Sequence, residues 1–158
     1  MLVKLAHGFT LVEALIVLSI AAIVLAIAVP NLSFLINSMN ARSASFDLIA
    51  DLALARSEAI KRNRSVTVAP LVGTNWAQGW RIADADNATV RERQALPASL
   101  SVASAVAELR FAPNGRVGTD VDTGLRTWAI TSSNATPRCV VITPTGTARS
   151  SVGKAGGC

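Results

Sequence analysis

The sequence is poor in histidine: its 158 residues contain a single one, His7. Nucleophilic catalysis by serine or cysteine needs a histidine base beside the nucleophile, and His7 stands near the very N-terminus. A structural zinc site needs closely spaced cysteine and histidine ligands, and no such set occurs. These absences exclude the common hydrolases and zinc proteins. No other residue set indicates an enzyme, and none indicates a cofactor.

Acidic residues are absent from the last part of the chain. Residues 138–158 contain three cations, Arg138, Arg149 and Lys154, and no Asp or Glu. In residues 65–137, by contrast, six cations accompany six acids, within a chain whose net charge is +5. Cations without competing acids favour an anionic partner, so the tail is the place to look for one.

Cysteine is nearly as scarce, with only Cys139 and Cys158. If the C-terminal part is exported, an even number of cysteines suggests one disulfide. It would close a loop of about 20 residues and stabilise the fold by roughly 3 kcal/mol. The alternative is a pair of unrelated free thiols.

Charge is also missing from a long stretch near the N-terminus. Residues 9–29 contain one ionisable side chain, Glu13. As a helix these residues would be about 31 Å long, enough to cross the hydrocarbon core of a bilayer. A secretory signal cleaved after Ala26-Ile27-Ala28 is one interpretation, but a carboxylate opposes insertion of the apolar region. A plain membrane anchor is another, and it leaves Glu13 as an unexplained cost.

A third interpretation uses every residue around Glu13. Gly8, Phe9, the following Thr10-Leu11 and Glu13 resemble the class III signal of type IV prepilins and type II secretion pseudopilins. The resemblance implies that a prepilin peptidase removes residues 1–8, His7 included, and that Phe9 is then N-methylated. The new amine of one subunit would pair with Glu13 of its neighbour, because an intramembrane carboxylate seeks a partner. Such a pair fixes register more than it adds net stability.

The next segment, residues 30–64, reads as a second half of the same helix. Pro30 predicts a kink or local melting near residues 26–30. Apolar side chains then recur every seven residues, at Leu32, Met39, Phe46, Ala53 and Ile60. This stripe is either a coiled-coil seam or, as we expect, the face on which a small sheet packs. Polar residues are expected opposite it: Arg42, Asp47, Asp51, Glu58 and Lys61. Lys61, Arg62 and Arg64 suit the helix dipole better than a nucleic-acid patch.

From residue 65 to 158 the apolar period changes from about 3.6 to 2, which indicates strands. We expect strands at 65–70, 79–84, 100–103, 108–112, 125–131 and 139–143. Asn114-Gly115 after Pro113 is a turn signal, while residues 114–124 and the tail after Pro144 read as loops. The predicted fold class is therefore α+β: a long N-terminal transmembrane helix packed on a small antiparallel β-rich domain.

Four separated blocks carry a narrower resemblance. They are residues 53–68, 75–80, 109–117 and 139–149, and they are similar in order and content to the pseudopilin-H/minor-pilin family, whose members include GspH, FimT and FimU. The resemblance implies a type IV pilin-like fold and a non-catalytic minor subunit near a filament tip. Its partners would be other pilin subunits and the inner membrane, with residues 65–158 in the periplasm.

The sequence is compatible with two kinds of filament. The two-cysteine C-terminus resembles FimT- and FimU-like pilus members, whereas the alternative is a type II secretion pseudopilin H that serves protein secretion and binds no DNA. FimT-like members are linked to DNA uptake through a basic Gly-Arg-x-Arg motif. This chain has Gly146-Thr147-Ala148-Arg149, which lacks the first arginine. Double-stranded DNA bound by Arg138, Arg149 and Lys154 remains one hypothesis, and an ordinary basic loop is the other.

Two further groups of residues invite a binding function. Asp84 with Asp86, and Asp120 with Asp122, are loop pairs that calcium could touch. Two carboxylates make an incomplete calcium site, so we expect solvated loops and no metal. Three tryptophans could stack on bases or sugars, but we expect buried anchors of a small core instead. They are Trp76, Trp80 and Trp128.

Overall fold

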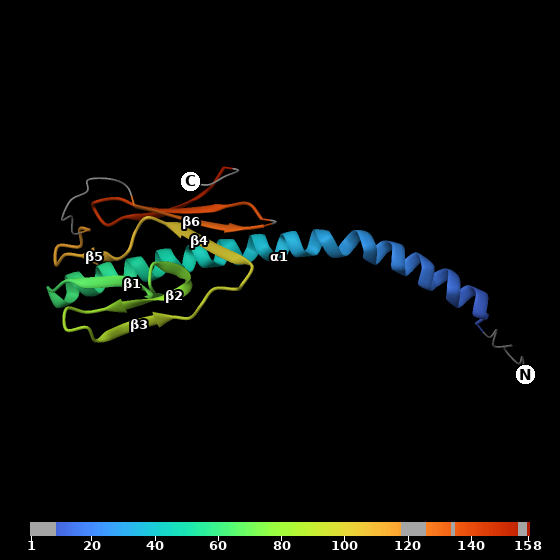
Figure 1. Cartoon of the computed structure of the whole chain (residues 1–158), viewed down its shortest axis with the longest axis horizontal. Coiled ribbons are helices and arrows are strands. Elements are labelled where there is room, and N and C mark those ends of the chain that lie inside the picture. Colours follow the sequence, from blue (N-terminus) through green and yellow to red (C-terminus); the bar gives the residue numbers. More distant parts are fainter. Residues whose placement is uncertain (1–8, 118–125, 134, 155–157) are drawn as a thin grey trace, which may run out of the picture.

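One long helix extends beyond a small β domain in the computed structural model (Figure 1). The structure describes residues 9–117, 126–133, 135–154 and 158, without the side chains of 29–31. Helix α1 (Leu11–Arg62) has 52 residues, and its second half lies against two antiparallel sheets. The predicted α+β, pilin-like fold class is confirmed. The leader, residues 1–8, lies outside the described residues.

Helix α1 runs without interruption through Pro30. Of the kink or local melting predicted near residues 26–30, the melting is wrong, and the helix instead curves along its blue, N-terminal part (Figure 1). A proline removes one hydrogen bond and crowds one turn, and bending absorbs this while the turns on both sides keep their own bonds. The helix ends at Asn63, whose left-handed backbone (φ 49°) is a common helix stop.

The first sheet, sheet A, follows the helix directly. Its strands are β1 (Val66–Val72), β2 (Asn75–Ala83), β3 (Thr89–Arg93) and β5 (Leu109–Phe111), in the spatial order β3-β2-β1-β5. All its pairings are antiparallel. We did not predict β3, because three of its five residues are charged and no apolar alternation marks it.

The second sheet, sheet B, carries the C-terminus. Its strands are β4 (Leu100–Ser104), β6 (Arg126–Ser132), β7 (Arg138–Ile142) and β8 (Ala148–Val152), ordered β4-β6-β7-β8 and all antiparallel. The expectation of a loop after Pro144 is wrong, because β8 pairs with β7 along its length. The polar residues of β8 give no apolar alternation that would predict a strand. Its backbone hydrogen bonds to β7 stabilise it instead.

The predicted turn at Asn114-Gly115 is confirmed. Gly115 has a positive φ of 74°, and its N–H donates to the Ala112 carbonyl at 2.8 Å. The Asn114 side chain accepts from the Arg116 N–H at 3.0 Å, as turn asparagines commonly do. This turn reaches back to the end of α1, where a Cβ on Gly115 would lie 2.6 Å from the Ile60 side chain.

Three tryptophans form the centre of the core between α1 and the sheets. Trp76 and Trp128 are fully buried and Trp80 is 2 % exposed. The Trp76 and Trp128 rings meet edge to face, with centroids 5.3 Å apart, an arrangement that aromatic pairs prefer. Their expected role as buried anchors is confirmed, so these rings are not available to stack on bases or sugars.

The face of α1 under the sheets is not the predicted one. The buried face, as we call it, consists of Ala41, Ala44, Leu48, Leu52, Ala55 and Ala59. Residues of the predicted stripe are exposed instead, including Phe46 at 53 % and Ile60 at 51 %. The expectation that the sheet packs on the stripe is wrong. Asp51, which was expected among the polar residues opposite the stripe, is fully buried. Alanines let the sheets approach the helix axis closely, and a pattern search weighted toward large side chains misses them.

Candidate functional site

The first turn of α1 holds the residues predicted to direct assembly. Phe9 and Glu13 are both exposed, Phe9 at 71 %. Thr10 is the N-cap, and its hydroxyl oxygen accepts a hydrogen bond from the Glu13 N–H at 3.2 Å. The Thr-x-x-Glu spacing is that of a capping box, a sequence signal we overlooked. Gly8, the predicted cleavage site, lies outside the described residues.

The helix beyond this turn is apolar on all sides. Its large hydrophobic side chains from Leu11 to Ile27 are more than half exposed. This is the one helix of the described chain that is long and apolar enough to cross a membrane. A helix that is hydrophobic all round requires a bilayer or other protein around it.

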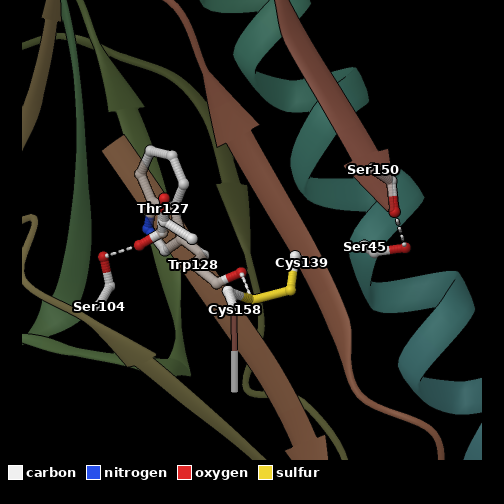
Figure 2. The surroundings of a disulfide bond; sticks show 7 residues. All are labelled: Ser45, Ser104, Thr127, Trp128, Cys139, Ser150 and Cys158. Atoms are coloured by element: carbon white, nitrogen blue, oxygen red, sulfur yellow. Dashed lines mark hydrogen bonds between the residues drawn. A yellow bond between two sulfur atoms is a disulfide. The ribbon is translucent and has the colours of Figure 1, made fainter. Parts of the chain in front are cut away.

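The two cysteines are joined. Cys139 of β7 bonds to Cys158, with their Cα atoms 5.6 Å apart. Figure 2 shows the bridge against β6, where the Cys158 sulfur lies 3.8 Å from the Trp128 carbonyl oxygen. The disulfide thus ties the C-terminal residue to the strand that carries a core tryptophan, as the even cysteine count suggested.

The three cations of the basic tail do not form one cluster. Arg138 pairs across strands with Ile130, which is buried, so it lies on the inner face of sheet B. Arg149 pairs with Val141 and lies on the outer face, because neighbours along a strand alternate between faces. Lys154 follows β8 and is exposed. Two of the three cations therefore face solvent, and the third is half-buried with no hydrogen-bond partner for its Nε among the described residues.

These features match known proteins at both ends of the chain. Residues 4–29 match the prokaryotic N-terminal methylation motif, and residues 44–146 match the model of the type II transport protein GspH. The chain belongs to the GspH family. It is a minor pilin or pseudopilin of a type IV pilus or a type II secretion system.

Solved structures agree with the GspH assignment. Two crystal structures of the type IV minor pilin FimU from Pseudomonas aeruginosa (strain PAO1) are 28 % identical in sequence and cover 72 % of this chain. Their TM-scores are 0.58 and 0.56, over 87 % and 92 % of the FimU chains. No curated protein sequence matches. GspH-family and FimU-like subunits are generally structural and non-catalytic, and the methylation motif implies processing by a prepilin peptidase.

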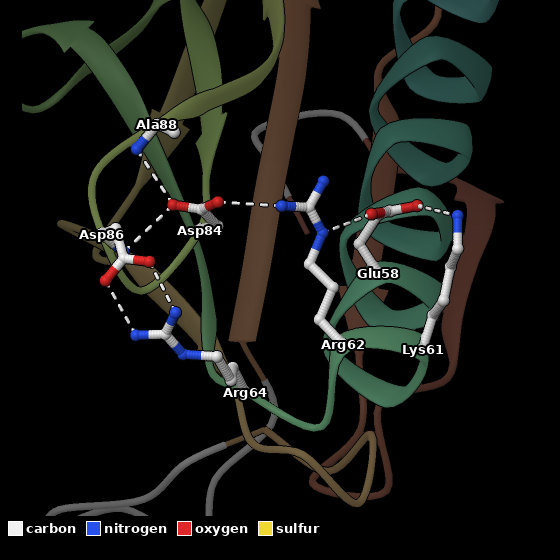
Figure 3. Close-up of polar contacts among 7 residues, drawn as sticks. All are labelled: Glu58, Lys61, Arg62, Arg64, Asp84, Asp86 and Ala88. Atoms are coloured by element: carbon white, nitrogen blue, oxygen red, sulfur yellow. Dashed lines mark hydrogen bonds and ion pairs between the residues drawn. The ribbon is translucent and has the colours of Figure 1, made fainter.

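The charged residues at the end of α1 form ion pairs within the GspH-type domain. Arg62 bridges Glu58 at 2.7 Å and Asp84 at 2.8 Å, and Arg64 forms a two-bonded pair with Asp86 (Figure 3). Hydrogen bonds from Arg64 lower the pKa of Asp86 below its usual range. The interpretation of this cation cluster as helix-end residues, rather than a nucleic-acid patch, thus has a structural basis.

The same contacts engage the first of the two aspartate pairs that were considered for calcium. Asp84 also accepts hydrogen bonds from the backbone N–H groups of Asp86 and Ala88, at 3.0 and 2.9 Å. Its oxygens and those of Asp86 are thus engaged by the protein itself. The second pair, Asp120 and Asp122, lies outside the described residues. Within the described part, no three His, Cys, Asp or Glu side chains gather as a metal site would require.

A buried carboxylate that the sequence did not lead us to expect joins α1 to sheet A. Asp51 accepts from the Trp80 indole N–H at 3.0 Å and from Arg91 and Arg93 at 3.1 Å each. The bond to Asp51 raises the pKa of Arg93. A buried charge persists only when paired and hydrogen-bonded, and the missed strand β3 supplies both arginines. The available sequence signal for this contact was a pair of acids four residues apart, Asp47 and Asp51.

Proposed function

We propose that this chain is stored in the inner membrane, with its β domain in the periplasm, and enters a filament through the first turns of α1. Cleavage after Gly8 would start the mature chain at Phe9. The observation that carries this proposal is the apolar segment from Leu11 to Ile27, which is exposed all round and matches the methylation motif. In the membrane lipid covers it, and in a filament other α1 helices do.

The register of assembly would come from a charge pair between subunits. Glu13 has no ion pair with any described residue of its own chain. A neighbour's Phe9 amine is the partner that cleavage creates. Desolvation makes an unpaired Glu13 costly inside the bundle, so only the register that joins the two charges is favourable.

The cleavage step is tested by the N-terminus of the mature protein. Mass spectrometry of the chain purified from membranes should find N-methylphenylalanine at position 9. A strain without prepilin peptidase should retain residues 1–8. A mature chain that starts at Val29 would instead establish an ordinary secretory signal and contradict the proposal.

The pairing step is tested by Glu13→Ala. The variant should reach the membrane normally and be depleted from filaments, while the core of the β domain is unchanged by tryptophan fluorescence. Glu92→Ala is the matched control, since Glu92 is an exposed carboxylate on β3, far along the chain from the first turn. Equal recovery of both variants in filaments would refute the pairing.

A second function, capture of double-stranded DNA, is favoured by the charge of sheet B. Its four strands contain three arginines and no acid. Arg149 on the outer face and the exposed Lys154 are the residues we assign to phosphate contact. Arg138 lies on the inner face, so its contribution should be small. Such contacts serve a pilus in DNA uptake, whereas a pseudopilus for protein secretion does not need them.

A gel-shift titration with the full chain in detergent micelles tests DNA capture. Arg149→Ala with Lys154→Ala should weaken binding and reduce the slope against log salt by about 2, one per phosphate contact. Arg138→Ala is the matched control and should bind like the unaltered chain. If the double variant and the control bind DNA alike, the tail is an ordinary basic surface. That result would favour the alternative, a pseudopilin that serves protein secretion.

A further inference from the structure

Three buried polar atoms between α1 and sheet B have no hydrogen-bond partner in the part of the chain that the structure describes. They are the Nε of Arg138 on β7, the Oγ of Ser132 at the end of β6, and the Oγ of Ser38 on α1. Leaving a buried donor unsatisfied is unfavourable, and most of all for a charged group. Buried groups of this kind call for a bound ion, a ligand or ordered water.

The register of sheet B places Arg138 and Ser132 close together on its inner face. Arg138 pairs with Ile130, and Ser132 follows Ile130 by two residues and pairs with the buried Leu100. Diagonal neighbours of this kind on antiparallel strands lie roughly 7–8 Å apart, within reach of a long side chain. The Arg138 guanidinium and the Ser132 hydroxyl therefore share one corner of the sheet.

Strand β8 shows which end of the domain this corner belongs to. Ala148, at the start of β8, borders the same groove as Ile60, and Ser150 donates to Ser45, with 3.3 Å between the hydroxyl oxygens. Later residues of β8 thus lie beside earlier residues of α1. In Figure 1, sheet B ends on this side where the uncovered half of α1 leaves the domain. We call this end of the domain the rim.

Arg138 and Ser38 both lie at the rim. Arg138 pairs with Val152, the last residue of β8. Ser38 precedes Ser45 by seven residues, which is about two helical turns on the same face of α1. Register and helical spacing thus bring Arg138, Ser132 and Ser38 to one corner between α1 and sheet B. We call these three residues the rim site.

The rim site is at the height of lipid headgroups when α1 spans the membrane. Ser38 lies 29 residues after Phe9, about 44 Å along a helix with a 1.5 Å rise. A bilayer is about 40–45 Å thick when its headgroups are included. A chain with Phe9 at one surface of the membrane therefore has Ser38 among the headgroups of the other surface.

The charges around the rim favour an anion. Helix α1 has no acid between Glu13 and Asp47, and the strands of sheet B have none. Arg42 is exposed about one helical turn after Ser38 and has no ion pair with a described carboxylate. An anionic ligand therefore meets no competing carboxylate here, and the guanidinium of an arginine suits a phosphate in particular.

We infer that the rim site binds the phosphate of an anionic phospholipid headgroup. Arg138 is the charged donor, and the hydroxyls of Ser38 and Ser132 are the neutral ones. The inference rests on the proposed storage of this chain in the inner membrane. It adds a specific contact between the β domain and lipid, which holds the domain against the bilayer until the subunit enters a filament. Arg138 is thereby assigned to lipid and not to DNA.

Native mass spectrometry of the full chain tests the rim site. The chain is held in detergent micelles that contain equal amounts of phosphatidylglycerol and phosphatidylcholine with the same acyl chains, so that only the headgroups differ. The unaltered chain should retain phosphatidylglycerol in preference. Arg138→Gln should lower this preference about tenfold, the order expected for one charge-assisted hydrogen bond. Arg138→Lys should restore part of it, because the charge returns without the planar fork.

Two further arginines provide matched controls, because their replacement by glutamine removes the same charge. Arg116 is exposed and follows Gly115 in the turn that packs on Ile60, at the other end of the domain. Arg116→Gln should leave the lipid preference unchanged. Arg42→Gln removes a charge at the rim but outside the rim site, so it should lower the preference less than Arg138→Gln does, and this smaller effect should disappear in high salt.

Unfolding of the same variants separates binding from misfolding. In phosphatidylcholine micelles, Arg138→Gln should have the unfolding midpoint of the unaltered chain, followed by tryptophan fluorescence. Added phosphatidylglycerol should raise the midpoint of the unaltered chain and not that of the variant, since a ligand stabilises only the fold that binds it. Ser132→Ala removes one neutral donor without removing charge, and it should lower the lipid preference about threefold.

The outcomes separate this inference from the proposed function. Equal retention of the two lipids, or an unchanged preference in Arg138→Gln, would overturn the rim site. The lipid assignment would also be wrong if millimolar inorganic phosphate raised the unfolding midpoint as much as phosphatidylglycerol does. A chain that starts at Phe9 and enters filaments without any lipid preference would refute the rim site alone. A mature chain that starts at Val29 would refute the membrane storage on which the inference rests.

Discussion

The two faces of α1 in the β domain differ in a way that helix packing alone does not require. The apolar side chains on the face under the sheets are four alanines and two leucines, whereas the face turned to solvent has Met39, Phe46 and Ile60. In a helix with one partner, the largest apolar side chains are expected inside. The reversal indicates two partners: the chain's own sheets, which need a slender helix to approach, and a second surface supplied by the assembly.

The largest difference between the faces should appear in stability. Leu52→Ala removes a buried side chain and should lower the free energy of unfolding by about 2–5 kcal/mol. Phe46→Ala removes a larger but exposed side chain, and its effect should stay within about 0.5 kcal/mol. Denaturant unfolding of the full chain in micelles, followed by tryptophan fluorescence, measures both. A Phe46→Ala cost close to that of Leu52→Ala would place the stripe in the core.

Enlarging alanines gives the second test of the comparison. Ala59 is fully buried, so Ala59→Leu should destabilise the domain by about 1–3 kcal/mol through overpacking. Ala53→Leu adds the same atoms to the exposed stripe and should leave stability unchanged. If Ala59→Leu is tolerated as well, the sheets do not approach the helix as closely as the structure has them.

A third comparison concerns the two aspartates that face sheet A. Asp51→Ala deprives the buried Trp80 N–H of its acceptor and should cost about 1–3 kcal/mol. Asp47 is 40 % exposed and lies 3.4 Å from Arg93, so Asp47→Ala should cost at most about 1 kcal/mol. The same unfolding assay applies. Equal costs would contradict the dominant role of the buried acceptor.

The smallest effect is expected at the helix end, which belongs to neither face. Arg64 lowers the pKa of Asp86. The Asp86 carboxylate therefore stabilises the fold at pH values above the pKa that the same carboxyl has in the unfolded chain. That contribution is lost as pH falls through the lowered folded pKa. Arg64→Ala should move the pKa of Asp86 upward, as NMR titration of its carboxyl carbon would show. An unmoved pKa would mean that the pair does not form in solution.

The two ends of the chain were predictable from sequence for different reasons. Glu13, Phe9 and Gly8 form a linear signal, and an even number of cysteines in an exported tail indicates a bridge. Strands with large apolar residues, such as β6, are indicated by the alternation of apolar and polar side chains. Each of these features is local, or depends on one simple count.

What could not be predicted depends on partners far apart in the sequence. The seven-residue stripe was assigned to the sheets because periodicity identifies an apolar face but not what covers it. The alanines of the buried face were not recognised as a buried face, and Asp51 was placed only among the polar residues opposite the stripe. Strands β3 and β8 lack alternation, because the first points arginines at α1 and the second is held mainly by its bonds to β7. These contacts between distant segments are visible only in the folded structure.

The central claim is that one face of α1 is covered by its own domain and the other by assembly. Maleimide labelling of single cysteines tests it directly, because Cys139 and Cys158 are joined in a disulfide. Ala55→Cys should react slowly in both the detergent-solubilised chain and the filament, and Gln78→Cys quickly in both. Ala53→Cys should react quickly in detergent and slowly in the filament. Fast labelling of Ala53→Cys in both states would contradict the account.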